Sequence, residues 1–500
     1  MGKNLYITTA IPYVNGTPHI GNALDYLLAD IWTRYQKQLG KEVRFQVGTD
    51  EHGNKIAAKA SEEGLTPQAY TDKMYPNFEV LMKKVGAEYT DFIRTTNPHH
   101  QGALQYIWQK LSAHIYKDKY EGWYCMGHEA FFTDKEVEET GGICPDHQKP
   151  YERVSEENYY LRASDFTDQI REAITTGRMR IVPEFRKNEF LQLITGGVPD
   201  VSISRPKKNL TWGVPVPGDH DHVMYVWFDA LANYITVLGY PDQEGWQDYW
   251  PADVQIVGKD ILRFHAGIWP AMLLGLGLPL PKKLLVHGFV NVGGAKMSKT
   301  VGNVVDPNQV IDEYGLDAFR YFFARHIPTQ DDGDFTWEKF EIAYNTELGN
   351  DLGNLISRVA SMVTRYQAGV IGDAPQGDHD MKPYFDAMNE LRFDQALDET
   401  WESIRALNKY IEMVKPWEIA GRRDKDPDAE AHLSEVLGQA VGTLLQIADQ
   451  LVPFLPGTAA AIKKTFASGV IVPLESAGGL FPKIYRHTAD PRTAAKATTN

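Results

Sequence analysis

The sequence predicts an α/β protein in which a doubly wound domain is split by an insertion and followed by an all-helical region. An apolar run from Leu5 to Thr9 leads through a loop into apolar residues at helical spacing between Leu24 and Tyr35. Strand-like runs return about 200 residues later, at Val254 to Val257 and around Leu284 to Val286. From about residue 338 onward the chain contains long amphipathic stretches instead.

The first elements follow each other in the order strand, loop, helix, strand. Leu5 to Thr9 is rich in β-branched and aromatic residues, which favours a buried strand. Pro12 and Pro18 mark the loop, and Gly40 is placed to end the helix. Val43 to Val47 reads as the next strand. This order is typical of the start of a doubly wound domain.

The middle and the end of the chain differ in character from its start. Residues 116–222 combine short extended stretches with many charges and both cysteines, so we expect an insertion there. Helical periodicity predicts helices over 340–368, 383–413 and 432–452. Residues 488–500 are small and polar, which is typical of a flexible tail.

The composition is that of a globular enzyme and excludes several classes of protein. The 500 residues are 43% hydrophobic and 23% charged, with 51 basic and 66 acidic residues and a net charge of −15. Without a basic excess, an RNA partner must be bound through local patches and base contacts. No apolar run approaches the roughly 20 residues of a membrane helix. The first residues carry no signal pattern, so we expect a cytoplasmic protein that does not enter a membrane.

The first candidate nucleotide motif, Pro-His-Ile-Gly-Asn at 18–22, lies between the first predicted strand and helix. A helix N-terminus presents backbone N–H groups and a positive dipole end, which suit phosphate. Gly21 lets a base or ribose approach the backbone, and His19 can donate a hydrogen bond to a phosphate oxygen. Such a short string also arises by chance.

The second motif is Lys-Met-Ser-Lys-Thr at 296–300, preceded by two glycines. The ammonium groups of Lys296 and Lys299 flank the hydroxyl of Ser298 on a flexible loop, which suits a mobile clamp on a triphosphate. A solvated basic loop is the commoner explanation for a single lysine pair. Both motifs, in this order beside the strands of a split α/β domain, favour a nucleotide site.

Both cysteines fall in Cys-x-x-His pairs, Cys125 with His128 and Cys144 with His147. Four soft or borderline ligands in this spacing predict a closed, tetrahedral structural Zn²⁺ site. A catalytic zinc is not expected, because four protein ligands leave no open position. The alternative is two thiols with unrelated surface histidines.

The two nucleotide motifs resemble the "HIGH" and "KMSKS" motifs of class I aminoacyl-tRNA synthetases. Four further stretches resemble methionyl-tRNA synthetases specifically, at 11–16, 48–53, 225–230 and 258–261. The resemblance extends from Tyr6 to about Trp417. The sequence departs from the family pattern at Asn22, where the family has His, and at Thr300, where it has Ser.

The resemblance implies a Rossmann-like class I catalytic domain split by a connective insertion, followed by an all-α anticodon-binding helical bundle. It implies ATP-dependent activation of L-methionine to methionyl-adenylate, with Mg²⁺, and transfer to tRNA(Met), including the initiator tRNA. The tRNA would be contacted at its anticodon and acceptor end, and we expect a monomer. The implied domains are the first catalytic half (1–115), the insertion with a zinc knuckle (116–222), the second catalytic half (223–290), the KMSKS-loop and stem-contact region (291–337), the anticodon-binding helices (338–487) and the tail (488–500).

The family's catalytic positions match His19, Asn22, Lys296 and Lys299. The implied ATP-binding residues are these four together with Gly21, Gly258, Asp260, Val290, Ser298 and Thr300.

The implied methionine-binding residues are Ile11, Tyr13, Asp50, Arg205, Trp227, Ala230, Leu231, Tyr234, Ile261 and His265. Asp50 would pair with the substrate ammonium, because a buried ammonium must be compensated. Residues 227, 230, 231 and 234 fall on one helix face; seen alone, such a stripe is more often core than pocket. Aromatic edges suit a polarizable sulfur, and the Tyr234 hydroxyl could donate a weak hydrogen bond to the thioether.

Three residues in the helical region match positions that read the anticodon. Asn354 and Arg358 are four apart and share a helix face, and Trp417 follows a proline. Single-stranded loops are read by hydrogen bonds to base edges and by stacking. Taken alone, these residues are equally consistent with a polar surface pair and a packed aromatic.

Three other functions stay open. A class I synthetase for another amino acid would share both motifs, although the synthetases for branched aliphatic amino acids carry a far larger insertion than 116–222. A small nucleotidyltransferase would need no helical region. A non-catalytic tRNA-binding relative would not need His19, Asp50 and both loop lysines.

Overall fold

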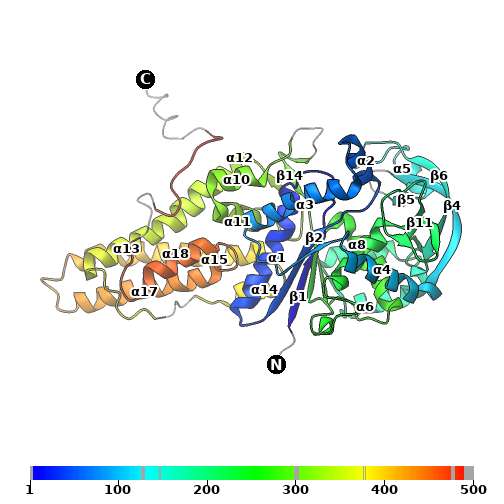
Figure 1. Ribbon diagram of the computed structural model, residues 1–500. Coiled ribbons are helices and arrows are strands. Elements are labelled where there is room, and N and C mark those ends of the chain that lie inside the picture. The colour runs from blue at the N-terminus through cyan, green and yellow to red at the C-terminus, as the bar shows by residue number, and fades with distance from the viewer. Residues whose placement is uncertain are drawn as a thin grey trace, which may run out of the picture. The chain divides into compact units, whose positions relative to one another are not determined.

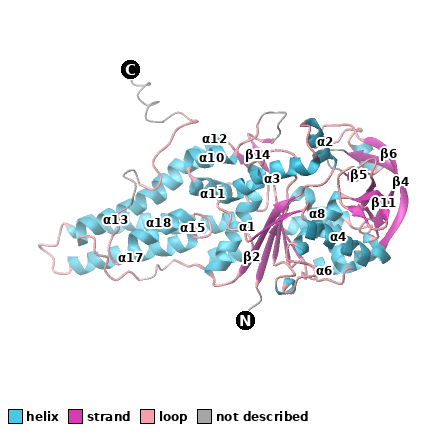
Figure 2. Cartoon of the chain, viewed as in Figure 1, coloured by secondary structure: helices cyan, strands magenta, loops and turns pink. Residues whose placement is uncertain are grey.

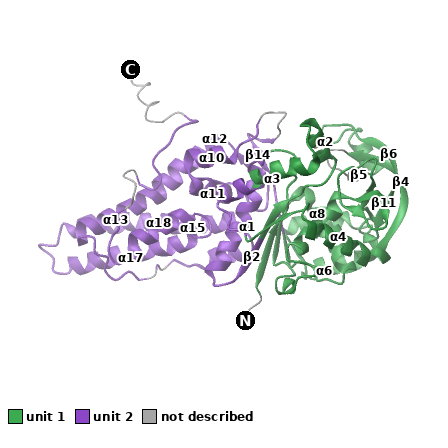
Figure 3. Cartoon of the chain, viewed as in Figure 1, with its two compact units in different colours: residues 1–17, 46–78, 90–284 green, residues 18–45, 79–89, 285–500 purple. Residues whose placement is uncertain are grey.

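The computed structural model describes residues 4–125, 130–145, 148–297, 303–375, 377, 379–473 and 479–488. The chain divides into two compact units. Unit 1 contains residues 1–17, 46–78 and 90–284, and unit 2 contains residues 18–45, 79–89 and 285–500 (Figure 3). Figure 1 shows the chain coloured from its N-terminus to its C-terminus, with many of its helices and strands labelled.

A six-stranded sheet with the order β3-β2-β1-β12-β13-β7 forms the α/β core (Figure 2). Its strands are β1 (Leu5–Thr9), β2 (Val43–Thr49), β3 (Asp91–Arg94), β7 (Arg180–Val182), β12 (Val254–Gly258) and β13 (Lys283–His287). All of β12 is buried, as expected for a parallel sheet that is covered on both faces. The four predicted strands are confirmed, and β2 continues two residues further to Thr49.

The parallel pairing of this sheet decides where its loops emerge. Strand β1 pairs in parallel with β12, so both end at the same edge. The ladder continues one step further, because the Ala10 N–H donates to the Ile256 carbonyl at 3.0 Å. The loop after β1 and the turn after Gly258 therefore leave the sheet together, at the edge where doubly wound folds bind ligands.

Helices accompany the sheet in unit 1. They are α2 (Asn54–Glu62), the first part of α3 (Pro67–Lys84), α4 (Pro98–Lys110), α6 (Thr167–Thr175), α7 (Glu184–Leu193), α8 (Val226–Thr236) and α9 (Trp269–Gly275), which continues a π-helical turn at Phe264–Ile268. Helix α8 is apolar on nearly all sides and almost entirely buried. Trp108 of α4 packs edge-on against Phe228 of α8, with ring centroids 5.4 Å apart.

The region between residues 115 and 224 adds two small antiparallel sheets. The first has the order β5-β4-β6-β8 and the second β10-β11-β9. Their bounds are β4 (Ile115–Cys125), β5 (Ala130–Phe132), β6 (Glu152–Leu161), β8 (Val201–Ser202), β9 (Ser204–Pro206), β10 (Pro215–Val216) and β11 (Asp219–Met224), with the short helix α5 (Asp134–Glu139) after β5. The long pair β4–β6 runs from Ile115 opposite Leu161 to Tyr124 opposite Glu152.

Unit 2 is mainly helical. Its helices are α1 (Ile20–Gln38), the end of α3, α10 (Pro307–Tyr314), α11 (Leu316–Arg325), α12 (Trp337–Ala343) with a π-helical continuation at Tyr344–Gly353, α13 (Asn354–Gln367), α14 (Lys382–Asn389), α15 (Phe393–Val414), α16 (Pro416–Ala420), α17 (Ala429–Leu451) and α18 (Pro456–Phe466). The predicted helix over 383–413 is two helices instead. Leu391 has a φ of 56°, which an α-helix does not accommodate, and its side chain is buried.

Helix α1 is anchored within unit 2 by a buried ion pair. Arg320 of α11 lies 2.7 Å from Asp30 of α1, and neither side chain is exposed. The Arg320 guanidinium also donates to the backbone carbonyls of Val85, Pro453 and Phe454. Gly40, with a φ of 75°, follows the end of the helix as predicted. Among the described residues, no helix has the length and apolar character needed to cross a bilayer.

Candidate active site

The predicted methionine-binding residues all belong to unit 1, and the first of them follow the strands β1 and β2. Tyr13 and Asp50 form a parallel bridge, and the Asp50 N–H donates to the Pro12 carbonyl at 2.9 Å. Asp50 is 5% exposed. A Cβ on Gly48 would lie 3.1 Å from Ile11 Cγ2 and would collide with the backbone of β3, so glycine is required there.

Helix α8 carries the predicted stripe. Ala230, Leu231 and Tyr234 are buried, and Trp227 is partly exposed at the start of the helix. The Trp227 ring stacks on Phe264, with centroids 3.7 Å apart and ring planes at 7°. Phe264 was not predicted from the sequence, although it directly precedes the predicted His265.

His265 and Tyr234 form a hydrogen-bonded chain with a defined direction. His265 Nδ1 lies 3.0 Å from the Ile261 carbonyl oxygen, and Nε2 lies 2.7 Å from the Tyr234 hydroxyl. Burial lowers the pKa of His265 to about 4, so the ring is neutral and carries one N–H. A carbonyl only accepts, so this N–H is on Nδ1 and the Tyr234 hydroxyl donates to Nε2. The structure thus directs the Tyr234 hydroxyl proton to His265. The predicted donation from Tyr234 to a thioether stays a prediction.

A buried His–Asp–His chain connects the segment after β2 to α8. His52 Nδ1 lies 2.6 Å from one Asp229 oxygen, and His100 Nε2 lies 2.8 Å from the other. Burial by itself raises the pKa of Asp229, but the two histidines outweigh it and lower this pKa to about 2. His100 Nδ1 lies 2.7 Å from the Thr236 hydroxyl. The ionised Asp229 thus fixes α8 relative to the segment that carries Asp50.

Arg205 lies on β9 and is buried. Its Nη1 donates to the Ser202 hydroxyl at 2.7 Å and to the Ser204 carbonyl at 2.8 Å. The guanidinium carbon is 4.2 Å from the centre of the Tyr225 ring, which immediately precedes α8. Arg205, Tyr225 and Gly53 line a cavity of about 300 Å³, to which the other predicted methionine-binding residues do not contribute.

Two predicted ATP-binding residues also belong to unit 1. Gly258 ends β12 and is buried, and Asp260 lies exposed in the turn that follows. Both are at the edge where β1 and β12 end together.

In unit 2, the first nucleotide motif caps helix α1. His19 Nδ1 accepts from the Gly21 N–H at 3.1 Å, and the Asn22 side-chain oxygen accepts from the His19 N–H at 3.1 Å. This is a capping box in which Asn22 takes the place of the usual Glu or Gln. Because Nδ1 accepts, the proton of the neutral ring is on Nε2, which can donate to a phosphate oxygen. A Cβ on Gly21 would lie 2.9 Å from His19 Cε1, so glycine lets the ring fold back over the helix end.

The described part of the second motif, Lys296 and Met297, begins in the second strand of a small hairpin in unit 2. Strands β14 (Val290–Val292) and β15 (Ala295–Lys296) pair, β14 also pairs with β16 (Gly333–Phe335), and Val290 is buried. The exposed Lys296 places its ammonium 4.9 Å from the centre of the Phe289 ring. Met297 Cε comes within 3.9 Å of the position of a Cβ on Gly21, so the second motif begins beside the first. Ser298, Lys299 and Thr300 lie outside the described residues.

The two cysteines lie together in the inserted region. Cys125 ends β4, and both Cys125 and Cys144 are buried in one cluster with Val137 and Tyr151. The loop after Cys144 is closed by two backbone hydrogen bonds, from the Cys144 N–H to the Lys149 carbonyl and from the Gln148 N–H to the Cys144 carbonyl, both 2.8 Å. The predicted ligands His128 and His147 lie outside the described residues, and no metal-binding cluster of three or more ligands occurs within the described ones.

The three predicted anticodon-binding residues lie on helices of unit 2, where Asn354 and Trp417 are exposed and Arg358 is half-buried. Asn354 starts α13 and is exposed, and Arg358 follows one turn later. The Arg358 guanidinium carbon lies 5.3 Å from the centre of the Trp417 ring, which is 38% exposed. Arg358 also pairs with Glu412 at 2.6 Å. The helices thus bring together residues that are 59 positions apart in the sequence, 358 and 417.

Most of the chain is similar in sequence to known class I tRNA synthetases. The family model described as "tRNA synthetases class I (M)" matches residues 5–154 and 146–360. The chain is 42% identical over 473 residues to the methionine–tRNA ligase of Caldanaerobacter subterraneus subsp. tengcongensis, covering 92% of this chain and 73% of that protein. It is 41% identical over 482 residues to the methionine–tRNA ligase of Bacillus subtilis strain 168, covering 91% and 72%.

Solved structures are similar over the same extent. Mycobacterium tuberculosis methionyl-tRNA synthetase bound by methionyl-adenylate has a TM-score of 0.88 and 34% sequence identity, covering 96% of this chain and 100% of that chain. The apo form of that synthetase has a TM-score of 0.83 and 31% identity, covering 97% and 99%. The predicted fold class, an α/β fold with a parallel sheet and a helical C-terminal region, is confirmed.

Proposed function

The chain belongs to the methionyl-tRNA synthetase family of class I aminoacyl-tRNA synthetases, and from this we propose that it activates L-methionine with ATP and charges tRNA(Met), including the initiator tRNA. The observation that carries the proposal is the capping box of α1, with Met297 beside it. This arrangement brings both nucleotide motifs together at one helix N-terminus.

The reaction has two steps. A carboxylate oxygen of methionine attacks the α-phosphorus of MgATP, the bond to the bridging oxygen breaks, and pyrophosphate leaves. A hydroxyl of the terminal tRNA ribose then attacks the carbonyl carbon of the adenylate, loses its proton, and AMP leaves. In the first step negative charge builds on the phosphate oxygens, where hydrogen-bond donors and cations stabilise the transition state.

We assign the phosphate-stabilising roles to unit 2. His19 donates from Nε2, since its Nδ1 is occupied by the Gly21 amide. Lys296 and Lys299 supply positive charge, with Ser298 and Thr300 as hydroxyl donors and Val290 next to adenine. Asn22 acts through the cap, because its oxygen holds the His19 amide.

We assign methionine recognition to unit 1. Asp50 binds the ammonium group, and Gly258 and Asp260 bind the ribose of ATP. The side chain packs among aromatic and aliphatic residues, for which the stacked pair Trp227–Phe264 and the buried Tyr234 are suited. Arg205 supports the start of α8 through Tyr225.

We propose one structural Zn²⁺ per chain, held by Cys125, His128, Cys144 and His147. The burial of both thiols in one cluster supports this, because thiolates that share a metal must converge. The closed loop after Cys144 supports it as well. When bound, the ion cross-links the inserted region. Metal analysis of protein purified without chelator should give about one zinc per chain. A ratio near zero with full activity would contradict the proposal.

We further propose that Asn354, Arg358 and Trp417 bind the anticodon, by base-edge hydrogen bonds and by stacking. The contact between Arg358 and Trp417 supports a common surface. We also propose the predicted domain boundaries, a cytoplasmic location and a monomeric state, on the resemblance to the family alone.

ATP–pyrophosphate exchange with each of the twenty amino acids tests the proposed function. Methionine should give exchange far above every other amino acid. Preferential exchange with another amino acid would make the chain a different class I synthetase. No exchange with any amino acid, together with binding of tRNA(Met), would favour the non-catalytic alternative.

A further inference from the structure

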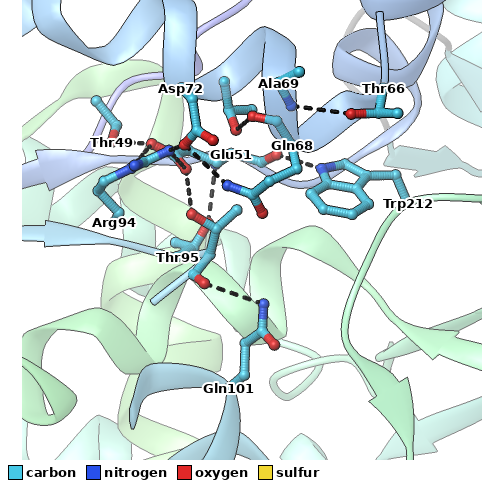
Figure 4. A network of polar contacts seen from close by, with 12 residues as sticks. Thr49, Glu51, Thr66, Gln68, Ala69, Asp72, Arg94, Thr95, Gln101 and Trp212 are labelled. Carbon is cyan, nitrogen blue, oxygen red and sulfur yellow. Dashed lines mark hydrogen bonds and ion pairs between the residues drawn. The ribbon is translucent and has the colours of Figure 1, made fainter. Parts of the chain in front are cut away.

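The acidic residue next to Asp50 is held by a network that no part of the proposed mechanism uses. Glu51 is completely buried in unit 1. Its carboxylate accepts two hydrogen bonds from Arg94, at 2.8 and 2.9 Å, one from the Thr49 hydroxyl at 2.8 Å and one from the Thr96 hydroxyl at 2.5 Å. Figure 4 shows the network around Glu51 and Arg94 from close by. Four donors on two oxygens saturate the carboxylate and compensate its charge.

The backbone of Glu51 is fixed as firmly as its side chain. Its N–H donates to the Thr95 hydroxyl at 2.9 Å, and its carbonyl accepts from the Trp212 indole N–H at 2.6 Å. Two residues further on, the Gly53 N–H donates to the Trp212 carbonyl at 3.0 Å. The peptide units on both sides of Glu51 therefore have little freedom to rotate.

Two further sets of contacts, besides those of Glu51, hold the backbone around Asp50. Its own N–H and carbonyl are in the ladder with Pro12 and Val14, at 2.9 and 3.2 Å. His52, on the other side of Glu51, is held by Asp229 of α8. The Glu51 carboxylate is directed to Arg94 and Thr96, while its backbone is continuous with that of Asp50.

We propose that Glu51 is a positioning residue for methionine activation, which holds segment 49–53 so that the Asp50 carboxylate meets the substrate ammonium in a fixed place. The inference rests on the proposed function, because it assumes that Asp50 binds the ammonium group. Arg94, which donates two hydrogen bonds to Glu51, is the second residue of this positioning network. Its remaining contacts, with the Asp72 carboxylate at 2.6 Å and over the Tyr75 ring at 4.0 Å, hold the guanidinium from the outside.

Glu51→Gln tests the proposal with almost no change of shape. The new amide N–H₂ would face donors, so the network must rearrange and Asp50 is no longer held. Binding is measured for methionine and for its desamino analogue, 4-(methylsulfanyl)butanoate, which keeps the side chain and carboxylate but lacks the ammonium. We expect methionine to bind about 10-fold more weakly, since a buried charged pair depends strongly on placement. The analogue should change less than about twofold, because it does not use the ammonium contact.

Three further variants keep the test decisive. Thr96→Val removes one donor to Glu51 without changing shape and should show the same selectivity for the ammonium at a few-fold level, even if Glu51→Gln folds poorly. Asp72→Asn removes the charge of the outer partner, which is 50% exposed, but keeps an oxygen that can accept from Arg94, so methionine binding should match the wild type. Ile170→Ala, at a buried position of α6, lowers stability without touching the segment and should not change the ratio of the two affinities.

The outcomes separate this inference from the proposed function. Equal weakening of methionine and the analogue in Glu51→Gln, or no weakening of either, would overturn the positioning role. If the wild-type chain gives no methionine-dependent exchange, the proposed function fails, and the inference fails with it. Normal wild-type exchange with an unchanged affinity ratio in both Glu51→Gln and Thr96→Val would overturn the inference alone.

Discussion

The predicted methionine-binding residues and the predicted anticodon-binding residues are built in opposite ways. Asp50, in unit 1, is 5% exposed and lies within a ladder, next to the buried Glu51 carboxylate, which accepts four hydrogen bonds. Trp417, in unit 2, is 38% exposed and has Arg358 over its ring. A small ligand with one ammonium group needs a carboxylate held in one place, whereas unstacked bases need flat and accessible side chains. The contrast suggests that chemistry and RNA reading can be damaged separately.

The largest effect is expected at the buried, predicted methionine-binding residues. Asp50→Asn keeps the shape but removes the charge that is proposed to pair with the ammonium. We expect kcat/KM for methionine in exchange to fall about 100- to 1000-fold, the range for breaking one buried charge pair. The KM for ATP should change little. Exchange within about threefold of the wild type would remove Asp50 from methionine recognition.

The unfolding free energy should also depend on pH through His265, another of the predicted methionine-binding residues. His265 has a pKa of about 4 in the folded chain, lowered by burial, against about 6.5 when unfolded. The unfolded chain therefore takes up this proton first, and the stabilisation is complete above pH 6.5 and is lost as the pH falls towards 4. Between pH 7.5 and 5 this residue should cost about 2 kcal/mol of unfolding free energy.

Denaturant unfolding at both pH values, compared between wild type and His265→Asn, isolates that contribution. The variant lacks the titrating ring, so its loss of stability between pH 7.5 and 5 should be smaller by about the same 2 kcal/mol. An identical pH dependence in the two proteins would show that His265 does not have the depressed pKa.

On the exposed side, Arg358→Gln should weaken tRNA binding and leave methionine activation unchanged. Losing one base-reading guanidinium costs about 1–3 kcal/mol, or five- to 150-fold in affinity. Filter binding of tRNA(Met) and methionine exchange on one preparation measure both effects. A parallel loss of exchange would contradict the separation of the two functions.

The smallest effect is expected at Glu412, which pairs with Arg358 at 2.6 Å but is largely exposed. Exposed ion pairs contribute about 0–1 kcal/mol, so Glu412→Gln should change tRNA affinity less than about fivefold. Because it keeps Arg358 and Trp417, this variant is the matched control for Arg358→Gln. A loss as large as that of Arg358→Gln would mean that the ion pair, rather than the guanidinium, carries the binding.

The sequence predicted what depends on local pattern. The strand at Leu5–Thr9, helix α1 and the common helix face of Asn354 and Arg358 follow from periodicity and short spacing. The break at Leu391 could not be predicted, because a leucine with positive φ is set by packing and not by its own preference.

Polar side chains that pair over long sequence separations were also not predicted from the sequence. Glu51 and Arg94 are 43 residues apart, and nothing in either neighbourhood indicates that they pair. The hydrogen bond between Tyr234 and His265 was not predicted for the same reason, since its direction depends on which nitrogen of His265 faces the Ile261 carbonyl. Sequence patterns identify candidate residues, whereas donors and acceptors are assigned only when partners are known.

Trp417→Ala is the most direct test of the central claim that methionine activation and anticodon reading lie in separate parts of the chain. Methionine exchange without tRNA, charging of tRNA(Met) and the thermal midpoint are measured on the same preparation. We predict normal exchange, an unchanged midpoint and impaired charging, because losing one stacking aromatic weakens tRNA binding by about 1–3 kcal/mol. Equal losses in exchange, charging and stability would contradict the account, because they would make Trp417 a core residue.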